Sequence, residues 1–534
     1  MKVFPVFCWL FWGPALGDKS MKVQESNRHE HLLLSLLLSI TIFLQLIFSG
    51  IERRIYMVDD ITKLIDLEDS DLIIEGPAIF KGVKVLTVSK RLQPTFCPIC
   101  GYRMHSRGIY TRMVNHPILQ DGTQLVLKLN QRRWKCLNPV CGNTCNDTFS
   151  FVDPRRRNTN ITDISIVMAF KDAHLSAAQI AKRFSVSDTY AINLFARYVD
   201  MPRRQFSDVI CVDEVHVNIS RVCKYALVIQ DFLTGEPIDM VASRRQEVTE
   251  PYFAGIPKAE RFRVKYLITD MYRPYIGYID KYFPNAVSIV DSFHVVKMIN
   301  GKILNYIRRL QNQYRRMDEE RHEDLEQKLG RRIDFTHSKE YYLLKNFRWL
   351  ILKNHDDIHY SGKSRYDYKL RRYITLGEIE DMLFDIDPDL RYIRNLKERY
   401  IHFNKKYGNR PREARQHLKD LIGIYRQCPF PLFHEVADSL TYFFESIINS
   451  FIMVERMCAD GVHISRLSNG PMEAMNHITK DIKRNGHGYS NFEHLRNRFL
   501  FSQRENAHVL ATPLPIEIAC PKTGRTRGPY KKDE

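Results

Sequence analysis

The sequence lacks the regular cysteine pattern of a disulfide-stapled secreted protein. Of its eleven cysteines, five fall between Cys97 and Cys145, and the other six are scattered singly along the chain. Clustered pairs with scattered single thiols are typical of a metal site in a reducing cytoplasm. The pattern therefore excludes a disulfide framework and favours metal binding.

Negative charge is also in short supply. The chain has 62 acidic residues against 80 lysines and arginines, which gives a formal net charge of +18 and a pI near 9.3. A balance this basic points to a polyanionic partner, with nucleic acid first and ribosomal or anionic-lipid partners left open by charge alone. The length of 534 residues and the 44% hydrophobic content leave room for several domains with sizeable cores.

Long apolar runs are scarce as well. The one clear example, Leu32 to Phe48, is short for a membrane span, which needs roughly 20 residues. A literal interpretation is a signal anchor or a single span. We prefer a translation start at Met57, which opens an ordinary amphipathic helix, so that residues 1–56 are a non-native extension. No membrane partner is then expected.

Two short cysteine pairs predict a structural zinc site. Cys97 and Cys100 flank Pro-Ile, Cys136 and Cys141 flank Leu-Asn-Pro-Val, and a glycine follows each pair. Four thiolates close a tetrahedral Zn²⁺ site, whereas five unrelated buried cysteines would have no reason to be spaced in this way. Cys145 is a fifth candidate that can replace Cys141.

A helix-turn-helix is predicted after a basic linker at residues 155–157. Helical patterns cover residues 161–173, 176–184 and 187–197, and Ser176 and Ser187 are good N-caps. Five apolar side chains are placed for a small three-helix core: Ile180, Phe184, Val186, Ile192 and Phe195.

An ordinary helical hairpin would give the same pattern, but the basic flanks favour DNA binding. The side chains predicted to reach a major groove or its phosphates are Arg183, Ser187, Asp188, Thr189, Tyr190 and Asn193.

From Asp208 onward the pattern changes to strands. Strand-like runs at 209–217, 225–230 and 238–243 precede a strand–helix–strand series at 264–269, 272–283 and 286–290. This is the order of an RNase H-like α/β domain, in which the first and fourth strands are neighbours. Asp213 in the first strand and Asp270 after the fourth would then face one another.

Residues from 295 to about 460 are charged and helical in pattern, with no repeat and no catalytic signature, which predicts a helical insertion. After it, Glu473, Asn476, Lys480 and Lys483 recur at intervals of three and four residues, on one face of a helix that begins near Asn469. A first-turn glutamate that satisfies the helix dipole would explain Glu473 but not the ordered row behind it. We expect that row, with Arg484, to steady a DNA strand.

Three distant carboxylates can therefore meet: Asp213, Asp270 and Glu473. Carboxylate oxygens are the ligands that Mg²⁺ and Mn²⁺ prefer, and two such ions about 4 Å apart can activate an attacking hydroxyl and stabilise the leaving oxygen of a phosphodiester. Asp291 also follows a strand and competes with Asp270, which we favour because its strand neighbours the first. Glu214 should point to the opposite face of its strand and is left outside the triad.

Taken together, these motifs resemble transposases of the ISL-three insertion-sequence family, one of the DDE group. Besides the helix-turn-helix, the matching pieces are Cys97–Gly101, Arg132–Cys136, Val212–Glu214, Asp270–Tyr275, Phe283–Ala286, Asp291–Lys297, Ser468–Glu473, Lys483–Arg484 and Gly488–Phe492. The resemblance implies a catalytic triad at Asp213, Asp270 and Glu473, a zinc-ribbon-like module and cut-and-paste or related DNA transposition. The apolar extension and Cys145 fall outside the pattern.

We therefore predict an α/β protein with an RNase H-like catalytic domain that carries a large helical insertion, preceded by a zinc-binding module and a helix-turn-helix. The expected segments are an extension at 1–56, a lead-in and zinc module at 57–152, a helix-turn-helix domain at 153–205, a catalytic domain at 206–505 with its insertion at about 300–460, and a basic tail at 506–534.

The expected activity is metal-dependent cleavage and strand transfer of double-stranded DNA, at the inverted repeats of an insertion sequence and at target DNA. The expected cofactors are Mg²⁺ or Mn²⁺ at the acids and structural Zn²⁺ at the cysteines, in a homodimer or higher oligomer at the prokaryotic nucleoid. Three alternatives remain: an RNase H-like nuclease or resolvase that cuts without joining, a DNA-binding regulator with an inactive catalytic domain, and a membrane-anchored protein.

Overall fold

The computed structural model describes residues 67, 69, 71–80, 82–117, 123–458 and 461–520. The apolar run at 32–48, the start at Met57 and the basic tail at 522–532 lie outside these residues. Within the described part of the chain, no helix is both long and apolar enough to cross a membrane. The chain divides into two compact units, Met1–Ile164 and Ser165–Glu534.

The first unit is a β-sheet with the cysteine pairs in the loops at the ends of its strands. Its strands are β1 (Leu72–Phe80), β2 (Val83–Lys90), β3 (Met104–His116), β4 (Leu125–Cys136) and β5 (Thr144–Asn146), in the order β1-β2-β4-β3 with β5 paired to β4. Apolar side chains alternate along β4, so Leu125, Leu127 and Leu129 pack together with Phe149 and Phe151. This small core gives the cysteine loops a fixed base.

Three short helices follow: α2 (Asn160–Ala169), α3 (Ala177–Phe184) and α4 (Asp188–Tyr198). Both predicted N-caps are confirmed, since the side chains of Ser176 and Ser187 accept hydrogen bonds from the backbone N–H groups of Gln179 and Tyr190. The prediction for Ile192 is wrong, because this side chain is 38% exposed. The core positions of α4 are Ala191, Leu194 and Phe195, one helical face away from Ile192.

The second unit is built around a five-stranded sheet. Its strands are β6 (Val209–His216), β7 (Tyr225–Asp231), β8 (Pro237–Val241), β9 (Tyr266–Thr269) and β10 (Val287–Val290), in the order β10-β9-β6-β7-β8. β6, β7 and β8 are antiparallel, whereas β9 runs parallel to β6 and β10 parallel to β9. The predicted contact between the first and fourth strands is therefore confirmed.

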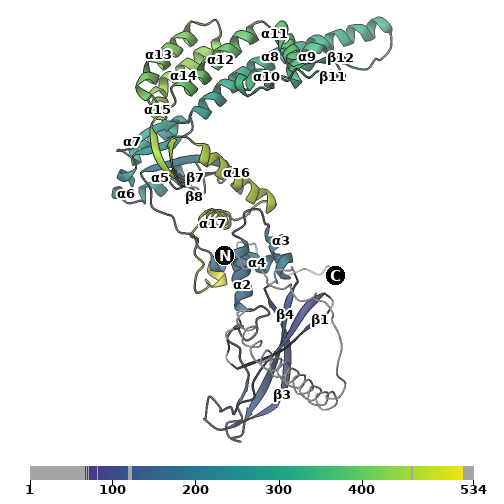
Figure 1. Ribbon diagram of the computed structural model, residues 1–534, viewed down its shortest axis with the longest axis vertical. Helices are drawn as coiled ribbons and strands as arrows, with labels where there is room; N and C mark the ends of the chain where they lie inside the picture. Colours follow the sequence, from purple (N-terminus) through teal and green to yellow (C-terminus); the bar gives the residue numbers. More distant parts are fainter. Residues whose placement is uncertain are drawn as a thin grey trace, which may run out of the picture. The chain divides into compact units, whose positions relative to one another are not determined.

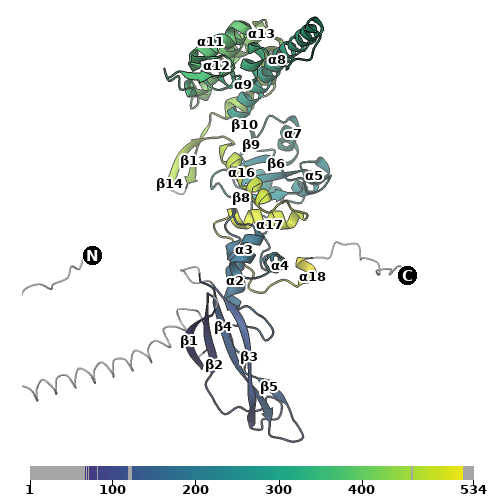
Figure 2. The same cartoon turned by 90° about the vertical axis from the view of Figure 1, so that its right-hand side faces the viewer.

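Both faces of this sheet are covered (Figure 2). On one face, Ile210 and Val212 pack with side chains of α5 (Gln246–Ala254) and α7 (Arg273–Tyr282), next to the short helix α6 (Lys258–Arg263). On the other, Cys211 and Val215 pack with side chains of α16 (Gly470–Asn485) and α17 (Phe492–Gln503), and α2–α4 join the same core. The three-helix segment thus shares its core with the sheet.

A helical insertion separates β10 from α16 (Figure 1). Its helices are α8 (Ser292–Leu329), α9 (Lys339–Asn346), α10 (Trp349–Leu352), α11 (Leu376–Ile386), α12 (Asp389–Lys406), α13 (Pro411–Gln427), α14 (Pro431–Tyr442) and α15 (Phe444–Asn449). They bury a core of their own that includes Leu344, Leu383, Tyr425 and Phe433.

The insertion is not purely helical. Two hairpins interrupt it: β11 (Arg365–Asp367) with β12 (Arg372–Ile374), and β13 (Met453–Cys458) with β14 (Gly461–Arg466). The second hairpin leads directly into α16. After α17, the short helix α18 (Ile516–Ala519) ends the described chain.

Candidate active site

Three acidic residues lie level with one another where the parallel pairing of β6, β9 and β10 ends. The register pairs Cys211 of β6 with Ile268 of β9, so Asp270, two residues further on, comes level with Asp213. In the same way, Val290 of β10 pairs with Thr269, which places Asp291 level with Asp270. The carboxyl edge of a parallel sheet is where open α/β folds place their ligand sites.

Asp213 faces α16, the helix that carries Glu473. The side-chain amide of Asn476 donates to Asp213 Oδ2 at 2.9 Å, and the backbone N–H of Glu214 donates to Asp213 Oδ1 at 2.7 Å. Burial raises the pKa of Asp213 to about 6, and the charge of Asp270 adds to the rise, although the bond from Glu214 opposes it. Because burial disfavours the charged form, the ionised Asp213 carboxylate costs free energy at neutral pH.

Asp270 has a similar environment. Burial raises its pKa to about 6, with a further contribution from the charge of Glu214, and its Oδ1 accepts a hydrogen bond from the backbone N–H of Tyr272 at 3.1 Å. Glu214 points to the other sheet face, as predicted, where Tyr275 of α7 donates to it at 2.5 Å and Arg244 pairs with it at 2.5 Å. The structure thus brings Asp213 and Asp270 together, while Tyr275 and Arg244 hold Glu214 within electrostatic reach of Asp270.

Glu473 lies in the first turn of α16, half-buried. Burial raises its pKa, and the next contribution comes from Asp291. Asp291 is 5% exposed, and both of its carboxylate oxygens accept backbone N–H hydrogen bonds. The edge therefore holds four acids, with Asp270 beside Asp213 and Asp291 beside Glu473.

The donor chemistry of Asp213, Asp270 and Glu473 fits Mg²⁺ or Mn²⁺. All three offer oxygen ligands, and burial opposes their negative charge, which a divalent cation would compensate. Among the described residues, the oxygens of the three acids are not all within 4.8 Å of one another.

Lys297, on α8, was not among the predicted site residues. Its charge lowers the pKa of Asp213, Asp270 and Glu473 alike, so it lies within electrostatic reach of all three. The signal in the sequence is its position six residues after Asp291, on the exposed side of the first turns of a helix.

A cationic hollow of about 420 Å³ lies at the far ends of β6 and α16. It is lined by His216, Lys480, Lys483, Arg484, His487 and Gly488. Lys480 and Lys483 were predicted from their spacing along α16, and Arg484 was predicted with them. The two histidines were not predicted, because they reach the hollow from a strand end and from the loop after the helix. Positive side chains around an open hollow suit the phosphates of a nucleic acid strand.

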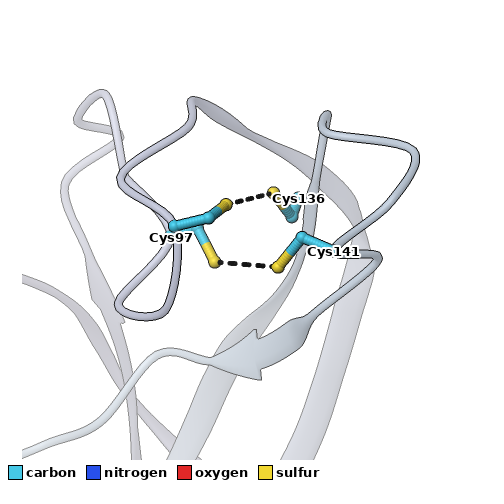
Figure 3. Close-up of side chains that lie close together, drawn as sticks. Cys97, Cys136 and Cys141 are labelled. Carbon is cyan, nitrogen blue, oxygen red and sulfur yellow. Dashed lines mark hydrogen bonds between the residues drawn. The ribbon is translucent and has the colours of Figure 1, made fainter.

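The four predicted zinc ligands meet in the first unit (Figure 3). Their sulfur atoms all lie within 4.8 Å of one another, with 3.8 Å between the sulfurs of Cys97 and Cys141 and 3.4 Å between those of Cys100 and Cys136. The glycines after each pair, Gly101 and Gly142, have φ values of +70° and +55°, which a side chain would strain. The cluster can therefore hold a tetrahedral metal ion.

The four thiols do not share one electrostatic environment. Backbone N–H hydrogen bonds, chiefly that of Cys100, lower the pKa of Cys97 to about 6, whereas burial raises the pKa of Cys136 to about 12. A bound cation would hold all four as thiolates. Cys145 lies outside this group of four sulfurs, and its own sulfur contacts that of Met104 at 3.6 Å. The geometry therefore favours Cys141 over Cys145.

The side chains predicted to read DNA are only partly available. Arg183, Ser187, Asp188 and Thr189 are exposed around the turn between α3 and α4, and Tyr190 is half-buried. Asn193 accepts a hydrogen bond from the thiol of Cys520 at 3.4 Å, because the segment that ends in α18 packs along α4. The exposed surface is therefore the N-terminal end of α4 with the last turn of α3.

The chain resembles known proteins along the part that holds the acids. A family model of the ISL3 type, described as a transposase, matches residues 210–499, from β6 to α17. The transposase for insertion sequence element IS1001 of Bordetella parapertussis is 22% identical over 377 residues, which cover 66% of this chain and 85% of that protein. All four acids at the sheet edge lie inside the matched range.

Proposed function

This chain belongs to the ISL3 family of transposases, whose model covers more than half of it, and from that premise we propose that it cuts and joins DNA at the ends of its own insertion sequence. The substrates would be the terminal inverted repeats and a target duplex. Asp213, Asp270 and Glu473 would hold two Mg²⁺ or Mn²⁺ ions, which supply activation of the attacking hydroxyl and stabilisation of the leaving oxygen when bound.

The observation that carries this proposal is the strand register. It makes Asp213 and Asp270 neighbours at one sheet edge, and the hydrogen bond from Asn476 to Asp213 ties the helix of Glu473 to the same edge. Three antiparallel strands followed by two parallel ones, with helices on both faces, support an RNase H-like domain. Residues far apart in the sequence thus converge where a phosphodiester can be held.

Within this site, the chain's own residues orient and bind the DNA. Asn476 keeps the Asp213 carboxylate turned toward α16. The cationic hollow begins at Lys480, and Lys483 lies ten residues beyond Glu473, about 15 Å along the helix at 1.5 Å per residue. The hollow would therefore hold backbone phosphates a few nucleotides from the scissile bond, through Lys480, Lys483 and Arg484.

Recognition of the ends would come from the first part of the chain. Ser187, Thr189 and Tyr190 at the start of α4, with Arg183, would read the inverted repeat as a helix-turn-helix does. The cysteine cluster would bind Zn²⁺ and stabilise the loops that present the basic strand β4. A homodimer or higher oligomer would bring the two ends together.

The test is cleavage and joining of a short duplex that carries the inverted repeat, with Mg²⁺. Asp213→Asn, Asp270→Asn and Glu473→Gln should each lower the rate at least ~10³-fold, while binding of the repeat stays within about twofold. Glu493→Gln on α17 is the matched control and should leave both unchanged. Full activity in a triad variant would remove that residue from the site. Cleavage without joining of pre-cut ends would favour a nuclease over a transposase.

A further inference from the structure

The buried carboxylate of Asp291 accepts a backbone hydrogen bond from the N-terminus of each of two helices. Asp291 is the N-cap of α8, where its Oδ1 accepts the backbone N–H of Phe293 at 3.2 Å. Its Oδ2 accepts the backbone N–H of Asn469, the N-cap of α16, at 2.9 Å. The two bonded residues are 178 positions apart and stand on either side of the helical insertion.

Asn469 depends on this contact because its own side chain does not cap α16. It is fully buried, and its side-chain amide lies 3.4 Å from His294 Nε2, one turn into α8. A carboxylate at a helix N-terminus also stabilises the helix through its dipole. Asp291 thus supplies from another element the cap that α16 lacks.

Asn469 is in turn hydrogen-bonded to Glu473. The first backbone hydrogen bond of α16 joins the Glu473 N–H to the Asn469 carbonyl oxygen at 3.1 Å. On the other side of Glu473, Asn476 is fixed to Asp213. The segment that carries Glu473 is therefore held at two points, Asn469 by β10 and Asn476 by β6, and these strands both border β9, which leads into Asp270.

We propose that Asp291 is a positioning residue, which acts through Asn469 to hold Glu473 at the distance from Asp213 and Asp270 that metal binding requires. This inference rests on the proposed function only for the role of Glu473. It differs from a role as metal ligand, in which an Asp291 oxygen would contact the ion directly. Since Asp291 also begins α8, the same bond couples the base of the insertion to the active-site helix.

Asp291→Ser tests the cap of α16 separately from the cap of α8. A serine at this position still caps α8 but has one short side-chain oxygen, which cannot also reach Asn469. The matched control is Asp318→Ser, since Asp318 is also buried and accepts the backbone N–H of a helix N-cap, Ser338, but inside the insertion. Asp318 also accepts the hydroxyl of Ser338 at 2.9 Å, so the control variant loses at least as many buried hydrogen bonds as Asp291→Ser does.

The first measurement is amide hydrogen exchange in metal-free protein. In Asp291→Ser, exchange in the first turn of α16 should rise at least ~10-fold, as expected when a local opening is eased by the loss of a buried hydrogen bond. Asp318→Ser should leave that turn unchanged. Unchanged exchange in Asp291→Ser, or an equal rise in Asp318→Ser, would overturn the proposal.

The second measurement is Mn²⁺ affinity, titrated by electron paramagnetic resonance without DNA. Asp291→Ser should weaken binding ~10–100-fold, as loss of a residue that orients a ligand does. In a Glu473→Gln background the same substitution should have no further effect, because Asp291 acts through Glu473. An equal loss in that background would make Asp291 a ligand itself and overturn the positioning role. If Glu473→Gln alone kept full affinity and cleavage, the proposed function would fail, while the exchange measurement would still test the contact.

Discussion

Neutralising Asp213 should make the metal-free protein more stable while it abolishes cleavage. Burial and the charge of Asp270 raise the pKa of Asp213 to about 6 from an ordinary value of 3.8. The folded state therefore binds this proton more tightly than the unfolded state does, so the ionised carboxylate destabilises the fold above about pH 6. The effect fades as the pH falls from 6 toward 3.8.

The magnitude follows from the two pKa values. A rise in pKa from 3.8 to about 6 corresponds to about 3 kcal/mol at pH 8, roughly half of that at pH 5 and less than about 1 kcal/mol at pH 4. Asp213→Asn removes this term but leaves one accepted hydrogen bond unmade, which costs about 1 kcal/mol. Asn476 Oδ1, which has no hydrogen-bond partner among the described residues, can turn to accept the new amide. The net gain at pH 8 is then about 2 to 3 kcal/mol.

The assay is urea unfolding in a chelating buffer, followed by circular dichroism at pH 8 and pH 4. Asp213→Asn should raise the unfolding midpoint at pH 8 and lose most of that gain at pH 4, and added Mg²⁺ should stabilise the native sequence but not the variant. Asp438→Asn, at an exposed position of α14, is the control and should change neither. A destabilised variant at pH 8, or a gain independent of pH, would refute the reasoning.

Three further predictions concern the other surfaces. Cys100→Ser should lower the zinc content from about one ion per chain to well below one, measured by plasma emission, because the four sulfurs would be the metal's ligands. The same variant should speed amide exchange in the adjoining ends of β3 and β4. Retained zinc with slow exchange would contradict this. Thr189→Ala should weaken binding of the inverted repeat by about 1–3 kcal/mol and leave binding to random DNA unchanged. Fluorescence anisotropy measures both affinities. An equal loss of affinity for both DNAs would assign Thr189 to phosphate contact. Lys483→Gln should reduce the slope of log Kd against log salt concentration by about 0.9, because it removes one phosphate contact of the hollow. The slope is measured from about 50 to 200 mM salt. An unchanged slope would mean that the DNA does not bind in the hollow.

Patterns among a few neighbouring residues predicted much of the local structure. Period-two alternation places Asp213 and Glu214 on opposite sheet faces, and the contacts of Asn476 and Tyr275 with them agree. Serine N-caps at Ser176 and Ser187 follow from residue type alone. Such features depend on a few adjacent residues, so the sequence specifies them without reference to the rest of the chain.

Errors arose where one pattern allowed two faces or two partners. Ile192 has the helical spacing of a core residue, but packing of α4 on α17 and the sheet selects the neighbouring face with Leu194. Cys141 was the predicted ligand and Cys145 its alternative, five and nine residues after Cys136, and in the fold the Cys141 sulfur lies 3.8 Å from that of Cys97.

By itself, the sequence determined the spacing of the cysteine pairs, the succession of strands and helices along the chain around Asp213, and the acidic and basic row on α16, because each depends on short-range spacing and residue type. Tertiary structure alone decided that Asn476 bonds to Asp213 across 263 residues and that Asp291 caps a helix 178 residues away. Those bonds depend on side-chain position to within an ångström or so, and strand register and helix packing set that position only once the whole domain has folded.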